Sequence, residues 1–317
     1  MIHDPTIVFE THARGKLLLT GEYFVLDGAL ALALPVRFGQ HLRVASAEEN
    51  LQWRSLDQQG SVWWEAAFAL PNLEVLQTTD HQVADTLISL LLACRRQNPE
   101  FLMDPSGLLV TTQIDFPKDW GLGTSSTLIA ALARWAHADP YPVLFTTLGG
   151  SGYDLACANA QGPILYQLTD NKPKVQPVDF QPLFTDQLFF VYLEKKQDSR
   201  AGIAHYRAQA QGKQDLIEKM SRLTHSLLAA TTLPEFESIL LEHEQLVSAT
   251  LDLPRAKDLF FKDYWGEIKS LGAWGGDFVL VTSQRSKKET QAYFNEKGCK
   301  VFIAYQDMTM YPPGLSS

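Results

Sequence analysis

Residues 121–126 read Gly-Leu-Gly-Thr-Ser-Ser and open an Ala- and Leu-rich run that continues to about His137. The two glycines permit backbone conformations and close approaches that other residues resist, and the Thr and Ser residues after them are suited to cap a helix. The first turn of a helix presents unpaired N–H groups and a partial positive charge, which attract phosphate groups. The stretch therefore predicts a polyphosphate-binding helix start, although it also fits a plain capped helix after a tight turn.

A second glycine-containing stretch lies near the N-terminus, where residues 13–23 read Ala-Arg-Gly-Lys-Leu-Leu-Leu-Thr-Gly-Glu-Tyr. It places Lys16 at the start of an apolar strand, with Gly15 immediately before it. A lysine fixed at a strand edge can extend into a cleft as a point charge. The alternative is a solvated lysine at the end of a strand.

Two further glycine turns follow later in the chain. Residues 150–154 read Gly-Ser-Gly-Tyr-Asp, and an aspartate held by such a loop can accept a hydroxyl proton or orient a nucleophile. Residues 272–277 read Gly-Ala-Trp-Gly-Gly-Asp, directly before the apolar residues 278–282. The simpler alternatives are a helix cap at Asp154 and an ordinary helix-to-strand turn at 272–277.

Hydrophobic periodicity predicts an α+β protein. Helices are expected at 82–97, after residues 121–126 to about 137 and at about 287–295, and most of 200–272 is expected to be helical; strands are expected at 108–114, 164–168, 188–193, 278–282 and 300–304. Residues 169–186, rich in Pro, Asp and Lys, are the best candidate linker. Since 317 residues exceed the size of a usual single core, we expect two domains, residues 1–170 and 171–317.

The net charge of −9 disfavours a sequence-independent grip on nucleic-acid phosphates. An anionic ligand would then need a locally basic pocket, for which Lys195, Lys196 and Arg200 are candidates. Arg200 could hold a carboxylate or phosphate with two parallel hydrogen bonds. A solvated charge cluster at a strand end is the alternative.

The cysteines Cys94, Cys157 and Cys299 are far apart and odd in number, which argues against a disulfide framework and a structural zinc site. The N-terminus lacks a signal-peptide pattern, and no apolar stretch approaches about 18 residues. These features predict a cytoplasmic protein without a membrane segment. The histidines of the helical stretches lack metal-ligand spacing and are interpreted as surface or core residues: His205, His225 and His243.

In their order along the chain, the four glycine-containing stretches resemble the motifs of the GHMP kinase superfamily, named for galactokinase, homoserine, mevalonate and phosphomevalonate kinases. The resemblance spans residues 13–282. Gly21-Glu22-Tyr23 and the 150–154 loop are most similar to the mevalonate-pathway branch, and to its phosphomevalonate kinases in particular. Mevalonate kinases share the same scaffold, so both acceptors stay open.

The resemblance implies an N-terminal α/β domain, a C-terminal ferredoxin-like domain and an ATP-dependent phosphotransferase. By matching position, Asp154 takes the place of the catalytic aspartate, and Lys16 would hold it ionised and stabilise charge on the transferring phosphoryl group. Ser125 takes the place of the serine that binds Mg²⁺. The implied ATP-binding residues are Gly121, Leu122, Gly123, Thr124, Ser125 and Ser126. The implied substrate-binding residues are Glu22, Ser151, Gly152, Tyr153, Lys195 and Arg200.

The sequence also departs from the family pattern. Arg14 stands where the family has proline, and Trp274 interrupts a loop that is usually built of small residues. Mevalonate kinases carry a magnesium-binding glutamate between the positions of Ser125 and Asp154, whereas the only acidic residue here is Asp139. Alternatives are therefore a catalytically weak or silent nucleotide-binding protein, a kinase for a sugar or amino alcohol, and a decarboxylase of the same fold. The expected partner is a small anionic metabolite, and a homodimer is left open.

Overall fold

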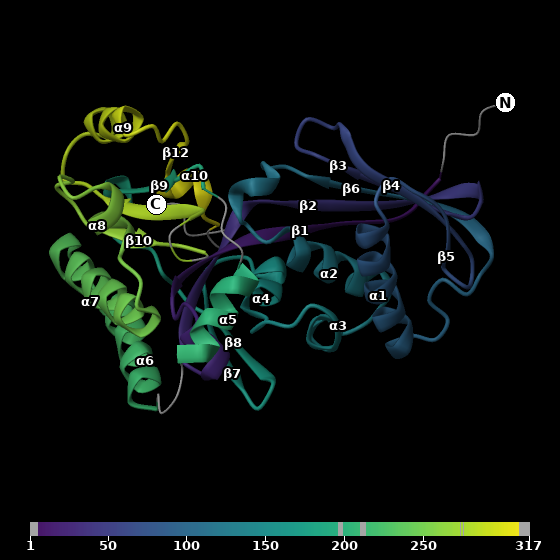
Figure 1. Ribbon diagram of the computed structural model, residues 1–317, viewed down its shortest axis with the longest axis horizontal. Helices are drawn as coiled ribbons and strands as arrows, with labels where there is room; N and C mark the ends of the chain where they lie inside the picture. The colour runs from purple at the N-terminus through teal and green to yellow at the C-terminus, as the bar shows by residue number, and fades with distance from the viewer. Residues whose placement is uncertain (1–5, 196–198, 210–213, 273, 275, 311–317) are drawn as a thin grey trace. The chain divides into compact units, whose positions relative to one another are not determined.

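The computed structural model describes residues 6–195, 199–209, 214–272, 274 and 276–310, with the backbone alone for residues 199 and 200. These residues belong to two compact units, drawn in Figure 1. Unit 1 comprises Met1–Gly15, Phe38–Lys118 and Gly123–Asn159, and unit 2 comprises Lys16–Arg37, Asp119–Leu122 and Ala160–Ser317. The expected domain division after residue 170 is contiguous in sequence and stays a prediction.

Two long strands contribute residues to both units. These are β1 (Ile7–Thr20) and β2 (Ala31–Glu49), which pair with each other. In unit 1, β2 pairs antiparallel with β6 (Ser106–Ile114). The sheet continues through β3 (Leu51–Leu56), parallel to β6, and then through β4 (Val62–Ala69) and β5 (Glu74–Thr78).

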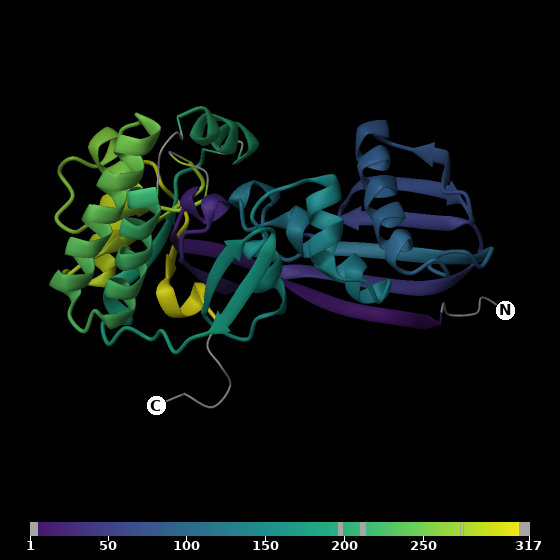
Figure 2. The same cartoon turned by 90° about the horizontal axis from the view of Figure 1, so that it is seen from below.

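The helices of unit 1 lie on one face of its sheet, as Figures 1 and 2 show. They are α1 (His81–Gln97), α2 (Thr124–Trp135), α3 (Pro140–Thr147) and α4 (Tyr153–Asn159). Alternate strand residues such as Leu42, Val44 and Trp53 are buried in one core with Leu87 and Ile129 of the helices. This alternation is the period of two that a sheet with one covered face requires.

Unit 2 contains a four-stranded antiparallel sheet in the order β10-β11-β9-β12. Its strands are β9 (Leu188–Tyr192), β10 (Ile268–Ser270), β11 (Phe278–Thr282) and β12 (Phe302–Ala304). Every residue of β9 and β11 is buried. Because both faces of these strands are covered, they read in the sequence as continuous apolar runs rather than as alternating ones.

The helical part of unit 2 follows β9 for the most part, as expected for residues 200–272. It consists of α5 (Ser199–Gln209), α6 (Gln214–Ala229), α7 (Leu233–Leu251), α8 (Ala256–Phe260), α9 (Lys287–Glu296) and α10 (Tyr305–Met308). Capping boxes begin α7 and α9, where Thr232 and Ser286 exchange hydrogen bonds with Glu235 and Glu289. The described residues also form three short 3-10 helices, which are η1 (Phe24–Asp27), η2 (Lys118–Trp120) and η3 (Thr185–Gln187).

The segment expected to be a linker is partly a strand. Within residues 169–186, β8 (Lys172–Pro177) pairs antiparallel with β7 (Ile164–Thr169), which in turn pairs with the first residues of β2. β8 lies at the end of the strand order, and an edge strand tolerates prolines because their missing N–H groups face away from the ladder. The prolines that suggested a linker are therefore compatible with a strand here.

Cys94, Cys157 and Cys299 are all buried free thiols. Within the described part of the chain, no helix is both long and apolar enough to cross a membrane.

Candidate functional site

The glycine-rich loop, residues 121–126, is fastened at its start to β1. The Lys16 ammonium donates a 2.9 Å hydrogen bond to the Gly121 carbonyl oxygen, and the backbone N–H of Lys16 donates one of 3.0 Å to the Leu122 carbonyl. All three residues belong to unit 2. Lys16 therefore lies within β1 rather than at the start of a strand as expected, because the strand begins at Ile7. It is hydrogen-bonded to the loop that was predicted to hold phosphate.

The Asp277 carboxylate packs against the same loop. A Cβ atom added to Gly121 would lie 2.5 Å from Asp277 Oδ2, and one added to Gly272 would lie 2.8 Å from the same oxygen. Both glycines also have positive φ angles, +68° and +74°. Two separate glycines thus make room for one carboxylate, and any side chain at Gly121 would displace it.

A second contact joins the N-terminal stretch to the turn at 272–277. The Trp274 backbone N–H donates a 3.0 Å hydrogen bond to the Tyr23 hydroxyl oxygen, and the Trp274 indole N–H donates to the Pro254 carbonyl. Trp274 is buried together with Tyr23 and Tyr206 in one core. The tryptophan that departs from the family pattern is therefore a packing residue of unit 2.

The remainder of the loop begins α2 in unit 1. Gly123 is the N-cap residue with a left-handed backbone (φ 97°), and it offers no side chain to cap the first N–H groups of α2. The Ser126 hydroxyl is buried and donates to the Gly123 carbonyl at 2.8 Å, whereas Ser125 is exposed. The first turn of α2 therefore keeps unpaired N–H donors beside an exposed hydroxyl, which suits an anion.

Asp154 lies in the first turn of α4 and is partly exposed. Its Oδ1 accepts a 3.0 Å hydrogen bond from the Leu155 N–H. The preceding Gly152 has a positive φ of 84° and its carbonyl accepts from the Ala156 N–H, while Ser151 is buried. The loop from 150 to 154 therefore starts a helix, as one of the two sequence interpretations expected, and leaves the carboxylate of Asp154 at the surface of the unit.

Arg134 holds the last residues of α2 and α4 together. Its guanidinium donates to the Ala158 carbonyl, to Asn159 Oδ1 and to the His12 carbonyl of β1. Because the helices α2 and α4 also pack on each other, their first turns, which carry Ser125 and Asp154, are fixed relative to one another. Both predicted residues therefore stand on a rigid helix pair.

Glu22 lies in a buried cluster of charged groups in unit 2. Its carboxylate forms an ion pair with Lys269 and contacts His243 Nε2 at 2.9 Å, and Lys269 also lies 3.4 Å from Glu244. Burial opposes ionisation of Glu22, but the charges of Lys269 and His243 lower its pKa to about 2. Burial raises the pKa of Glu244 to about 7. Glu22 is thus a charged residue of the core, and its predicted contact with substrate stays a prediction.

Of the three candidate basic residues, the structure describes the side chain of Lys195 alone. Lys195 is exposed, and its ammonium lies 3.9 Å from the centre of the Phe260 ring, while its carbonyl accepts from the Asp277 N–H at 2.7 Å. Arg200 lies in α5, but its side chain is outside the described atoms, and Lys196 is outside the described residues. Lys195 is therefore the described candidate for an anion-binding cation on this strand end.

Asp139 does not replace the missing glutamate. It is the N-cap of α3, where its Oδ1 accepts a 3.0 Å hydrogen bond from the Tyr141 N–H. This geometry explains the acidic residue as a helix cap.

Two residues of this region were missed as candidates from the sequence. Asp277 was noted only as part of a turn, and Lys269 was not noted at all. The only feature of the sequence that could have indicated Asp277 was its place at the end of the Gly-Gly-Asp stretch, residues 275–277. Lys269 follows Ile268 in a short strand and carries no local signal of its burial.

Comparison of the sequence with family models gives no match, and comparison with curated proteins gives none either. Three solved structures are similar over most of their length. The L. major mevalonate kinase in complex with R-mevalonate has 16% identity and a TM-score of 0.69, covering 98% of this chain and 99% of its own. The Streptococcus pneumoniae phosphomevalonate kinase in complex with phosphomevalonate and AMPPNP has 16% identity and a TM-score of 0.68, covering 93% and 98%.

The third similar structure is Lactococcus lactis galactokinase complexed with galactose. It has 11% identity and a TM-score of 0.63, and the match covers 91% of this chain and 88% of that chain. At identities this low, the likeness shows the shared fold alone.

Proposed function

We propose that this chain, which has the two-domain α+β fold of the GHMP kinases, is an ATP-dependent kinase that phosphorylates a small anionic metabolite. The proposed acceptor is a hydroxyl of mevalonate or the phosphate of phosphomevalonate. The bound ligands of two similar structures, R-mevalonate and phosphomevalonate with AMPPNP, support this choice. So does the resemblance of residues 21–23 and 150–154 to the mevalonate-pathway branch.

The observation that carries the proposal is the start of α2. The left-handed Gly121 and Gly123 precede a helix whose first N–H groups lack a capping side chain, and the Lys16 ammonium lies at 2.9 Å from the Gly121 carbonyl. The oriented N–H groups of the α2 start in unit 1 and the fixed Lys16 cation of unit 2 each favour the negative charge of phosphate groups. When bound, ATP supplies the phosphoryl group.

The same helix start offers one ligand for Mg²⁺. The Ser125 hydroxyl is exposed and makes no hydrogen bond within the described residues. Mg²⁺ commonly keeps several waters and uses few protein ligands beside phosphate oxygens, so a single hydroxyl fits its needs without an additional carboxylate.

With mevalonate as the acceptor, Asp154 is proposed to accept the proton of its hydroxyl and to orient that oxygen for in-line attack; with phosphomevalonate, a phosphate oxygen attacks and needs no proton transfer. The new bond joins that oxygen to the γ-phosphorus, the bond to the β,γ-bridging oxygen breaks, and ADP leaves. Lys16 stabilises the charge on the transferring group. Ser151, Gly152, Tyr153 and the basic residues Lys195 and Arg200 are proposed to contact the acceptor.

A nucleotide-binding protein without turnover is the second candidate. It is favoured by the absence of the family glutamate, since the one acidic residue between Ser125 and Asp154 caps α3. This candidate predicts nucleotide binding and no ADP release.

The test is ADP release by the full chain with Mg²⁺ and ATP, measured separately with mevalonate, phosphomevalonate and galactose. Release with mevalonate or phosphomevalonate supports the proposal, and release with galactose alone changes the acceptor to a sugar. Nucleotide binding without ADP release from any of them overturns the kinase and favours the second candidate. Measuring carbon dioxide in the same samples identifies a decarboxylase of this fold.

A further inference from the structure

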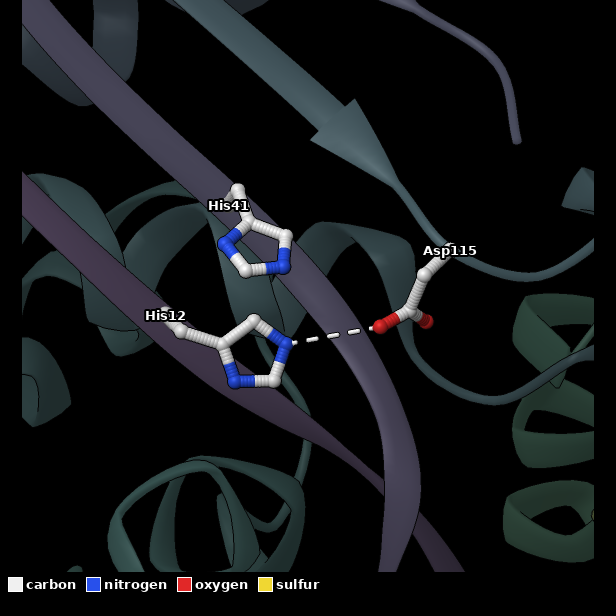
Figure 3. A group of neighbouring side chains, drawn as sticks. All are labelled: His12, His41 and Asp115. Atoms are coloured by element: carbon white, nitrogen blue, oxygen red, sulfur yellow. Dashed lines mark ion pairs between the residues drawn. The ribbon is translucent and has the colours of Figure 1, made fainter. Parts of the chain in front are cut away.

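A group of two histidines and one aspartate gathers in unit 1, and the proposed kinase reaction uses none of the three side chains. His12 lies on β1, His41 lies on the neighbouring β2, and Asp115 follows the last residue of β6. Figure 3 shows both imidazoles side by side, each with a ring nitrogen on the side that faces the Asp115 carboxylate. Three potential metal ligands thus come from two neighbouring strands and from the residue that follows β6.

The distances within this group are close to those of a coordinated ion. His12 Nε2 lies 3.5 Å from Asp115 Oδ2, the two ring centres are 4.3 Å apart, and the three ligand atoms all lie within 4.8 Å of one another. Ligands about 2.0–2.2 Å from a tetrahedral ion are roughly 3.5 Å apart. A side-chain movement of about one ångström therefore closes the group around an ion.

The orientation of Asp115 is fixed by the backbone of β2. Its Oδ1 accepts a 2.6 Å hydrogen bond from the Gly39 N–H, which leaves Oδ2 toward His12. A metal-binding carboxylate held by a hydrogen bond to its other oxygen is the arrangement that tunes metal sites in general. Gly39 also gives the imidazole room, because a Cβ atom there would lie 2.5 Å from His12 Nε2.

Nε2 of His12 is buried, and it has no hydrogen-bond partner within the described residues. The 3.5 Å between this nitrogen and Asp115 Oδ2 is the distance of an ion pair. A buried ring nitrogen that faces a carboxylate without a hydrogen bond indicates that a ligand binds between the two groups. A metal ion between the two would satisfy both atoms.

The charges around the group permit a cation. Arg43, two residues after His41 on β2, is paired with Glu10, two residues before His12 on β1, at 3.0 Å. That pair is neutral as a whole. A further cation, Arg134, is bonded to the His12 backbone carbonyl rather than to its ring, and Asp115 supplies the negative charge among the three proposed ligands. His41 is exposed and the side chain of Asp115 is 37% exposed, which leaves water access to the remaining coordination positions.

We propose that His12, His41 and Asp115 bind a divalent transition-metal ion such as Zn²⁺, with water in the remaining coordination positions. Imidazole and carboxylate ligands suit Zn²⁺ and Co²⁺. The ion cross-links β1, β2 and the residue that follows β6, and it stabilises unit 1 by binding the folded state. The site is independent of the proposed kinase reaction.

The experiment uses the full chain without a histidine tag, freed of metal and nucleotide. Co²⁺ is titrated in as a spectroscopic substitute for Zn²⁺, and Zn²⁺ is then added in competition. We expect one Co²⁺ per chain, visible absorption bands of a four- or five-coordinate ion, and loss of these bands on addition of Zn²⁺. Zn²⁺ should also raise the Tm by several degrees.

His41→Ala removes one ligand from an exposed position and His81→Ala removes an exposed histidine of α1 as the matched control. Loss of a ligand should weaken Co²⁺ binding by about tenfold or more, with no Tm rise on Zn²⁺, whereas His81→Ala should bind as the wild type does. Asp115→Asn should behave as His41→Ala. Absence of stoichiometric binding by the wild type, or equal affinity of wild type and His41→Ala, overturns the proposal.

Discussion

The ammonium of Lys269 and the carboxylate of Glu22 form an ion pair inside unit 2, where Lys269 is fully buried and the Glu22 side chain is 4% exposed. The pair joins β10 to the residues directly after β1. Removing two charges from water is costly, and their attraction repays that cost only when both partners are present. The buried charge of each residue is therefore tolerated only while the charge of the other is present.

Lys269→Met should reduce the free energy of unfolding by about 3–5 kcal/mol, because it leaves Glu22 buried without its principal partner. Denaturant unfolding of the full chain measures the loss. Lys219→Met is the control, since Lys219 is paired with Glu242 at the surface and an exposed pair contributes about 1 kcal/mol or less. The double variant Glu22→Gln, Lys269→Met should lose less than the sum of its single variants. Additive losses would contradict the coupling.

The contribution of Glu244 to the stability of the protein should fall as the pH rises from about 4.5 to about 7, whereas burial lowers the pKa of His243, and that group acts in the opposite direction below about pH 6.5. Burial raises the pKa of Glu244 from 4.5 to about 7, so the folded state keeps a proton that the unfolded state has already lost. The stability from this group is complete below pH 4.5 and is lost as the pH passes about 7, a change of up to roughly 3 kcal/mol. Glu22 has the opposite effect. Because its pKa is lowered to about 2, its contribution to stability is present above pH 4.5 and is lost as the pH falls below that value.

Unfolding free energies at pH 5 and pH 7.5 measure this change. Glu244→Gln keeps the shape of the side chain and cannot ionise, so the wild type should lose more stability than this variant between the two pH values. A variant with the same slope as the wild type would show that another group is responsible.

Much of the fold could be predicted because its signals are local. α1 was expected at 82–97 and begins at 81, since Asp80 caps it and Arg95 and Arg96 lie in its last turn. β11 was expected at 278–282 and has those bounds, because its residues form a continuous apolar run. β8 was not foreseen, because prolines in an edge strand look like those of a loop.

What the sequence could not supply are relationships between distant residues. His12, His41 and Asp115 have no motif spacing, and their proximity follows from the pairing of β2 with β1 and β6. Asp277 meets Gly121 only because two turns from distant parts of the chain pack together. The resemblance to the GHMP kinases indicated which stretches of the chain matter. The side-chain contacts between those stretches could not be derived from the sequence.

Gly121→Ala should weaken nucleotide binding by about tenfold or more, a loss of about 1.4 kcal/mol. The new Cβ atom would lie 2.5 Å from Asp277 Oδ2, and the φ of +68° is unfavourable for alanine. The carboxylate or the loop must therefore move. Isothermal titration with a non-hydrolysable ATP analogue measures the effect.

Gly298→Ala is the control for backbone strain in a turn outside the loop, after α9. Gly298 has a φ of +92°, and nothing lies within 4 Å of an added Cβ atom, so this variant carries the backbone strain alone and should bind nucleotide as the wild type does. Asp277→Ala combined with Gly121→Ala relieves the steric conflict and should recover part of the affinity if the collision dominates. Wild-type binding by Gly121→Ala would show that the loop does not hold the nucleotide.

Asp154→Asn should reduce turnover by about 10²- to 10⁴-fold, the usual contribution of a general base, and should leave nucleotide binding nearly unchanged. Asparagine retains the Oδ1 atom that accepts the Leu155 N–H, so α4 keeps its start while the carboxylate loses its charge and its basicity. Asp139→Asn is the matched control, because Asp139 also accepts a backbone N–H with Oδ1 at a helix start. Its turnover should equal that of the wild type. Both variants keep the hydrogen bond that Oδ1 accepts and remove one charge. A loss confined to Asp154→Asn therefore identifies a chemical role rather than a folding defect, and equal rates for both would remove Asp154 as the base.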